Sequence, residues 1–163
     1  MEPPGKKRIS FWGVGPAVGV PTACYGLAAL ALTLVGPSAF AIAWLPYPWL
    51  AALAGLLLAI GVPWYVIAVR TVWKAYRAER LVTDGVYALC RHPIYAGWIL
   101  LILPALGLLA NSWLVLSTAV VMYVLVRLLV RREEQSLEAQ FGEQYAEYKR
   151  RTNGIFPTLP KRH

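Results

Sequence analysis

Charged residues are scarce in this 163-residue sequence, and two long stretches lack them altogether. They make up 15% of the chain, against roughly a quarter in soluble proteins. Residues 9–69 contain no Asp, Glu, Lys or Arg over 61 positions, and residues 92–126 contain none over 35. A membrane-spanning helix needs about 20 apolar residues, so the first stretch can hold two spans and the second two short ones. With 58% hydrophobic residues and a mean hydropathy of +0.53, this pattern excludes a disordered chain and a soluble enzyme.

Cysteine is also scarce. The chain has two, Cys24 within a predicted span and Cys90 outside the spans, so we expect them at opposite ends of the fold. A disulfide scaffold is therefore excluded, and no metal site is indicated. The length is too short for two membrane domains, and we expect a single domain over residues 1–163.

The net charge of +8 is unevenly distributed along the chain. Lys and Arg number 3 in residues 1–8, 5 in residues 70–91 and 8 in residues 127–162. With four spans these segments share one face, while the turns near residues 36–48 and 111–112 carry no charge. Basic residues mark the cytoplasmic side, which places both termini in the cytoplasm. The charge thus indicates topology and contact with membrane lipids, and implies neither nucleic acid nor a protein partner.

The pattern predicts an all-α integral membrane protein of about four transmembrane helices. We expect spans at residues 14–35, 49–69, 95–110 and 113–130, the last two forming a tight hairpin around Asn111-Ser112. The second helix can continue beyond the lipid, because Arg70, Lys74 and Arg77 share one helix face. Residues 81–94 are predicted to be non-helical, with a turn at Asp84-Gly85. Helical spacing of apolar residues predicts that residues 131–151 form a C-terminal amphipathic cytoplasmic helix.

The candidate chemistry lies at the cytoplasmic border of the last two spans. Before the hairpin stand Tyr87, Arg91, His92 and Tyr95, and after it stands the pair Glu133-Glu134. The open ends of a hairpin are neighbours, so the two groups are expected to meet. Cationic groups suit a carboxylate, a glutamate suits an ammonium group, and aromatic rings suit a flat base. S-adenosylmethionine combines these three features.

Each of these features also has a purely structural explanation. His92-Pro93 can begin the third span, with proline in its first turn. Glu133-Glu134 beside two arginines is, taken alone, better explained as a solvated helix face. Tyr145 and Tyr148 are interpreted as packing residues, and the basic face of the second helix as a headgroup contact.

Two separate blocks of the sequence resemble one known family. Residues 81–98 (LVTDGVYALCRHPIYAGW) closely resemble the cofactor region of isoprenylcysteine carboxyl methyltransferases. Residues 133–151 (EEQSLEAQFGEQYAEYKRR), followed by Phe156-Pro157 and Pro160, resemble a second region of that family, at a distance that fits without a gap. The wider superfamily includes phospholipid N-methyltransferases, small-thiol methyltransferases and, more distantly, membrane sterol reductases.

The resemblance implies a membrane-embedded S-adenosylmethionine-dependent methyltransferase, with S-adenosylhomocysteine as product. Residues 1–80 would hold the first two spans, and residues 81–160 would bind the cofactor under the C-terminal helix. A lipophilic or lipid acceptor would arrive from the bilayer. Carried over by position, the cofactor-binding residues would be Arg80, Leu81, Val82, Tyr87, His92, Pro93, Ile94, Tyr95 and Glu133. The catalytic candidates are Arg91, His92 and Glu134, of which Glu134 or water would take a proton from an amine acceptor.

One position departs from the family pattern. Leu129 stands where the prenylcysteine enzymes place a substrate-handling arginine, four residues before the glutamate that matches Glu133. A carboxylate acceptor would lose its obvious partner there, whereas an amine headgroup does not need it. Isoprenylcysteine carboxylate-like and phospholipid amine-like acceptors therefore both stay open.

Two other classes compete with a methyltransferase. An NADPH-dependent, sterol-reductase-like enzyme would need a longer chain and extra basic residues for a 2′-phosphate. A non-enzymatic four-helix scaffold or small transporter is the other class, and the absence of a membrane-buried carboxylate speaks against proton coupling in a transporter. Abundant Ala, Leu, Val, Arg and Gly with only two Asn hint at a bacterial source and an inner-membrane location.

Overall fold

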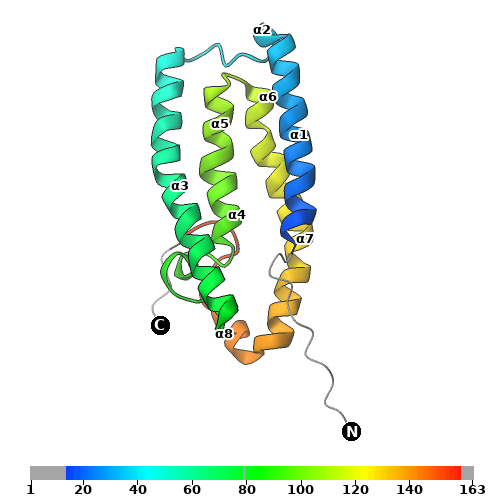
Figure 1. Ribbon diagram of the computed structural model, residues 1–163, viewed down its shortest axis with the longest axis vertical. Helices are drawn as coiled ribbons and strands as arrows, with labels where there is room; N and C mark the ends of the chain where they lie inside the picture. The colour runs from blue at the N-terminus through cyan, green and yellow to red at the C-terminus, as the bar shows by residue number, and fades with distance from the viewer. Residues whose placement is uncertain (1–13, 79, 159–163) are drawn as a thin grey trace.

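The structure is a computed structural model that describes residues 14–78 and 80–158. Its described part is helical throughout, without a strand, apart from one isolated bridge between Ala41 and Ser112. The long helices run side by side along the longest axis of the molecule (Figure 1). This arrangement confirms the expectation of an all-α fold.

Three helical stretches are long and apolar enough to cross a membrane: Gly15–Val35, Tyr47–Arg77 and Trp113–Phe141. The first is α1 (Gly15–Val35) and the second is α3 (Tyr47–Arg77), with the short α2 (Pro37–Phe40) between them. At 1.5 Å per residue the 31 residues of α3 extend over about 46 Å. That length exceeds the roughly 30 Å hydrocarbon core of a bilayer, so the basic end of α3 continues beyond it as one helix.

A shorter apolar stretch, Pro93–Leu109, consists of three helical segments. These are α4 (Pro93–Gly97), the π-helical η2 (Trp98–Ile102) and α5 (Leu103–Leu109). His92 caps α4 and Pro93 occupies its first turn, where the missing N–H of proline costs nothing. The structural explanation of His92-Pro93 is therefore confirmed.

A tight turn joins this stretch to the next helix. Asn111 adopts a positive φ of 48°, and the Ser112 side chain accepts the Val115 N–H to cap α6 (Trp113–Leu116). The next helix, α7 (Thr118–Phe141), follows at once. A Cβ added to Gly107 would lie 2.6 Å from the Leu116 Cα, so only glycine permits this close approach. The expected turn at Asn111-Ser112 is thus present.

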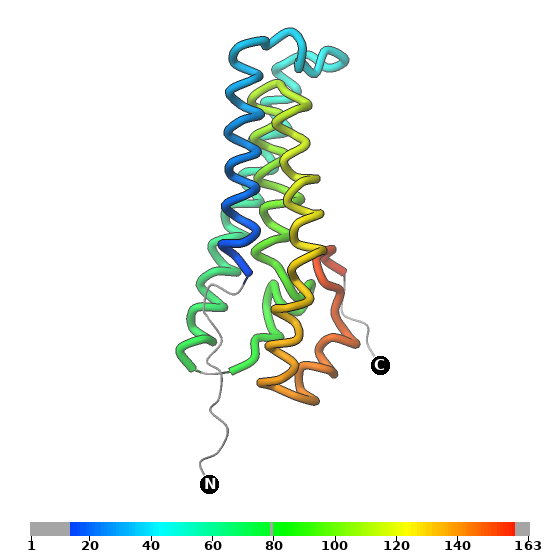
Figure 2. The backbone as a smooth tube through the Cα atoms, turned by 90° about the vertical axis from the view of Figure 1, so that its right-hand side faces the viewer, coloured from blue at the N-terminus to red at the C-terminus, as the bar shows by residue number. Residues whose placement is uncertain are grey.

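The single helix expected over residues 131–151 is instead divided in two. The first half extends α7 to Phe141, and α8 (Glu143–Arg151) follows after Gly142. Gly142 has a φ of +54°, a conformation that glycine adopts at no steric cost and that ends a helix. The chain therefore changes direction there, and α8 turns back toward the loop before α4 (Figure 2).

The segments α4 to α7 form the hairpin, and each of its two arms packs against a different long helix. α3 packs against α4, η2 and α5, whereas α1 packs against α6 and α7. The loop of residues 80–92, with the short 3-10 helix η1 (Gly85–Ala88), lies at the same end of the molecule as α8 (Figures 1 and 2). We call this end the charged end.

The segment after α8 fastens this loop through its backbone. Arg91 N–H donates to Asn153 O at 2.8 Å, and His92 N–H donates to Gly154 O at 3.0 Å. Thr158 N–H donates to Leu89 O at 3.0 Å. Backbone hydrogen bonds from residues 153–158 thus hold the loop that carries Arg91 and His92 in place.

Candidate functional site

One large cavity of about 2130 Å³ runs from the charged end into the apolar part of the bundle. Its walls come from α1, α3, both arms of the hairpin, α8 and the loop of residues 80–92. All nine residues carried over as cofactor contacts line it: Arg80, Leu81, Val82, Tyr87, His92, Pro93, Ile94, Tyr95 and Glu133. Residues from both sides of the hairpin therefore face one space.

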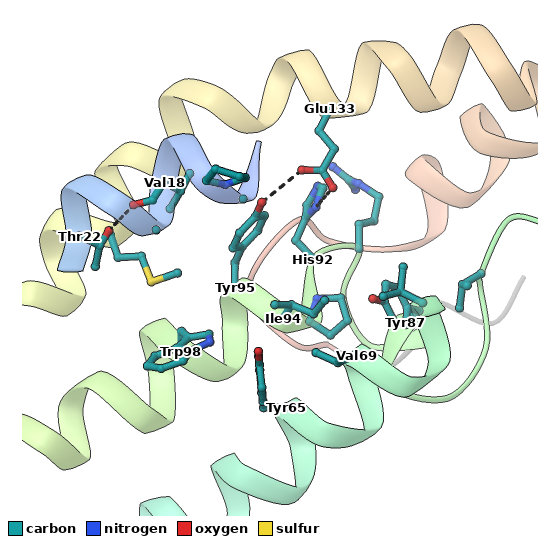
Figure 3. A pocket seen from close by; sticks show the side chains of 18 of the residues that line it. Val18, Thr22, Tyr65, Val69, Tyr87, His92, Ile94, Tyr95, Trp98 and Glu133 are labelled. Carbon is teal, nitrogen blue, oxygen red and sulfur yellow. Dashed lines mark hydrogen bonds and ion pairs between the residues drawn. The ribbon is translucent and has the colours of Figure 1, made fainter. Parts of the chain in front are cut away.

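Glu133 faces the cavity from α7, opposite the start of α4 (Figure 3). The Tyr95 hydroxyl donates to Glu133 Oε2 at 3.3 Å, and His92 Nδ1 lies 4.0 Å from Glu133 Oε1. The Glu133 side chain keeps 26% of its surface exposed, whereas the His92 side chain keeps 4%. The expected meeting of the two ends of the hairpin is confirmed, and it leaves an accessible carboxylate on the cavity wall.

Glu134 does not line the cavity. Its carboxylate is instead bound by three basic side chains. Its Oε1 accepts hydrogen bonds from Arg91 Nη2 at 2.8 Å and Arg91 Nε at 3.1 Å, and His92 Nε2 lies 3.3 Å away. Its Oε2 lies 3.3 Å from Lys149 Nζ. Arg91 also donates to the carbonyls of Lys149 and Thr152. This cluster ties the loop, α7 and α8 together.

Tyr87 is buried where η1 meets α3. Its hydroxyl donates to Ala68 O at 3.4 Å, and its own carbonyl accepts the Tyr148 hydroxyl at 2.6 Å. Burial, with a smaller contribution from Glu133, raises the pKa of Tyr87 well above its ordinary value. The phenol is therefore neutral at physiological pH.

The apolar half of the cavity has a different character. It is lined by side chains from α1 and the hairpin, among them Val18, Thr22, Trp98, Leu106, Thr118 and Met122, and by Tyr65 of α3. No charged residue of the described chain lines this half. Leu129 is not among the residues that line the cavity; it is half-buried and packs against the main hydrophobic core. The cavity thus joins a charged site to an apolar compartment.

Several cavity residues were not anticipated from the sequence. Tyr145 was expected to be a packing residue, yet its ring lines the cavity, and so do Tyr65 and Arg77. Tyr65 and Trp98 contact each other edge to face, with ring centroids 5.8 Å apart. A Tyr145–Tyr148 spacing of three residues does place both on one helix face, but it does not indicate a cavity beside that face.

Fold and site together define an integral membrane protein whose cavity combines a polar site with an apolar compartment. Residues 53–139 match the model of the isoprenylcysteine carboxyl methyltransferase (ICMT) family. This match covers more than half of the chain, and the chain belongs to that family.

Curated relatives with different names share part of this chain. Protein-S-isoprenylcysteine O-methyltransferase of Mus musculus is 38% identical over 79 residues, which cover 48% of this chain and 28% of the mouse protein. The cobalt-zinc-cadmium resistance protein CzcN of Cupriavidus metallidurans is 41% identical over 80 residues, or 48% of this chain and 36% of that protein. Methanethiol S-methyltransferase of Crocosphaera subtropica is 30% identical over 89 residues, or 55% of this chain and 34% of that enzyme. The chain therefore spans only about a third of the length of these relatives.

Proposed function

We propose that this protein is an S-adenosylmethionine-dependent methyltransferase that acts on a lipophilic acceptor within the membrane. One observation carries the proposal. The nine residues that match the family's cofactor contacts all line a cavity whose other half is apolar and uncharged. Such a cavity suits a polar methyl donor at one end and an apolar acceptor at the other.

The residues at the charged end fit the donor chemically. Glu133 offers an accessible carboxylate for an ammonium group, and Arg80 and Arg77 line the same end and suit a carboxylate. Tyr87, Ile94 and Tyr95 supply flat and apolar surface for a base. When bound, S-adenosylmethionine would supply a methyl group on a positively charged sulfur, and this group would pass to the acceptor as the carbon–sulfur bond breaks and S-adenosylhomocysteine leaves.

The protein's own contribution is alignment and exclusion of water. His92 lies 3.3 Å from Glu134 and 4.0 Å from Glu133, and Tyr95 holds Glu133 by a hydrogen bond. We assign Arg91 and Glu134 a positioning role rather than a catalytic one, because their polar atoms are engaged with one another and with Lys149 and Thr152. Proton loss from an amine product is accordingly assigned to water.

The acceptor is proposed to lack a carboxylate. No charged side chain of the described residues lines the apolar half of the cavity, and Leu129 replaces the arginine of the prenylcysteine enzymes. An amine headgroup lipid or a lipophilic thiol fits this environment; the Crocosphaera relative is named for a thiol acceptor and the mouse relative for an isoprenylcysteine. A prenylcysteine carboxylate is the alternative.

We further propose that Pro93–Leu109 is a fourth membrane span, so that the hairpin crosses the bilayer and returns. Both termini would then be cytoplasmic, because the charged end holds the basic residues while the turn end has none. A bacterial inner membrane fits this orientation. The segment over residues 131–151 would lie in the cytoplasm, with the buried Tyr145 and Tyr148 toward the bundle and the charged residues outward.

The test is calorimetric titration of the detergent-purified protein with S-adenosylhomocysteine, with NADPH as control. We expect micromolar affinity for S-adenosylhomocysteine alone, followed by transfer of a labelled methyl group to amine or thiol lipids. Binding of NADPH alone would indicate a reductase instead of a methyltransferase. Binding of neither by folded protein would favour the scaffold.

A further inference from the structure

Two buried side-chain oxygens in the described part of the chain have no hydrogen-bond partner, and both line the cavity. They are Thr118 Oγ1, in the apolar half, and the Tyr145 hydroxyl, at the charged end. Thr118 is 2% exposed and Tyr145 is 1% exposed. Buried polar groups in folded proteins are nearly always paired, so an orphan beside a cavity indicates a partner that the cavity itself holds.

The surroundings of Tyr145 show why no protein group satisfies it. The neighbouring Tyr148, whose ring centroid lies 6.2 Å away, directs its hydroxyl to the Tyr87 carbonyl. Arg91 is close enough to act on the Tyr145 oxygen as a hydrogen-bond donor, but a guanidinium has no acceptor for the phenol proton. Tyr145 therefore belongs to the cavity wall, and its enclosed phenol O–H has no protein acceptor.

Burial, and secondarily Glu134, raises the pKa of the Tyr145 phenol above its ordinary value. The phenol is thus a neutral hydrogen-bond donor at physiological pH, between the opposite charges of Arg91 and Glu134. A phenol O–H donates more strongly to a charged oxygen than to a neutral one. Glu133, which suits an ammonium group, lies in the same part of the cavity.

We propose that Tyr145 is a further binding residue of the donor site, and that its hydroxyl donates a hydrogen bond to the carboxylate of the donor's amino-acid part. This inference rests on the proposed function. It makes α8 a wall of the donor site rather than packing alone. The amino-acid end would then lie between Glu133 on α7 and Tyr145 on α8.

The test compares Tyr145→Phe with Tyr123→Phe, the same chemical change at a tyrosine that does not line the cavity. Loss of one hydrogen bond to a charged group predicts a rise of about tenfold or more in the Kd for S-adenosylhomocysteine. The unliganded melting temperature of Tyr145→Phe should equal or exceed that of wild type, because an unsatisfied buried hydroxyl has been removed. Tyr123→Phe should leave the Kd unchanged.

A second ligand tests which group the hydroxyl meets. 5′-Methylthioadenosine keeps the nucleoside and lacks the carboxylate and ammonium groups, so Tyr145→Phe should not weaken its binding. Equal losses for both ligands would overturn the assignment to the carboxylate. Unchanged S-adenosylhomocysteine affinity in Tyr145→Phe, with normal wild-type binding, would overturn the role of Tyr145 alone. Failure of wild type to bind would overturn the proposed function and this inference together.

Discussion

Glu133 and Glu134 are adjacent in the chain, yet they lie on opposite sides of the cavity wall. Glu133 faces the cavity and accepts from Tyr95 at 3.3 Å. Glu134 is turned away from it and accepts from Arg91 at 2.8 Å. His92 lies between them, with Nδ1 toward Glu133 and Nε2 toward Glu134. One carboxylate is therefore available to a ligand, while the other holds the site together.

Glu133→Gln should consequently affect ligand affinity, whereas Glu134→Gln should affect stability. Glu133→Gln should raise the Kd for S-adenosylhomocysteine at least tenfold with little change in melting temperature, because it removes an accessible charge. Glu134→Gln should cost on the order of 2 kcal/mol of stability, because it removes the negative charge paired with the half-buried Arg91 guanidinium. Titration and thermal unfolding of both proteins check this pair. Equal loss of stability in the two variants would contradict the division of roles.

His92→Ala should abolish binding of S-adenosylhomocysteine. The imidazole lines the cavity and contacts Glu134, so its removal takes away part of the cavity wall and one of the groups that hold the Arg91–Glu134 cluster. The backbone role of His92 at the start of α4 survives the change, so the protein should still insert into membranes and purify as a folded species. Calorimetry combined with size-exclusion chromatography measures both properties. Near-normal affinity in a folded His92→Ala protein would remove His92 from the site.

Leu129→Arg should shift acceptor choice toward carboxylates. Position 129 lies one helical turn before Glu133, on the same face of α7, and an arginine there would supply the missing partner for an anionic acceptor. The measurement is the ratio of labelled methyl transfer to a prenylcysteine and to an amine lipid. Leu128→Arg is the control, because Leu128 is 68% exposed on the outside of the bundle. An unchanged ratio would place selectivity elsewhere.

Cys90 should resist thiol reagents in the folded protein. Burial raises the pKa of its thiol from 9.0 to about 12, and the thiolate is the reactive species. A Cys24→Ser variant, which keeps Cys90 alone, should react with Ellman's reagent at pH 8 only after unfolding. Because the folded pKa is the higher one, the native thiol keeps its proton while the unfolded thiol loses it. Stability should therefore fall as pH rises from about 9 to 12. Rapid labelling of native protein at pH 8 would refute the burial.

Gly107→Ala should disrupt the hairpin. The new methyl group would lie 2.6 Å from the Leu116 Cα and 2.7 Å from the Leu116 nitrogen, so backbone would have to move. Gly55→Ala is the matched change in α3, where nothing lies within 4 Å of the added carbon, and alanine is the better helix former. Thermal unfolding should show a clear loss for the first variant and none for the second. Equal melting temperatures would mean that the hairpin is less tightly packed.

The apolar helices and the turn between the last two of them can be predicted from the sequence. The charge-free stretches specify the apolar helices, and the two polar residues Asn111-Ser112 specify the turn that brings Tyr95 and Glu133 together. The different directions of Glu133 and Glu134 depend on the rotation of α7 within the bundle, which spacing does not set. The division at Gly142 was also hidden, because the apolar residues Leu137, Phe141 and Tyr145 keep helical spacing across it. The cavity beside Tyr145 results from that division.

The backbone hydrogen bonds from residues 153–158 to residues 89–92 have a consequence for biogenesis. These later residues leave the ribosome after every helix of the bundle, so the loop with Arg91 and His92 lacks these hydrogen bonds until residues 153–158 have been made. The candidate site is therefore completed last. A nascent chain arrested before residue 153 would contain all the apolar helices and still lack a finished site.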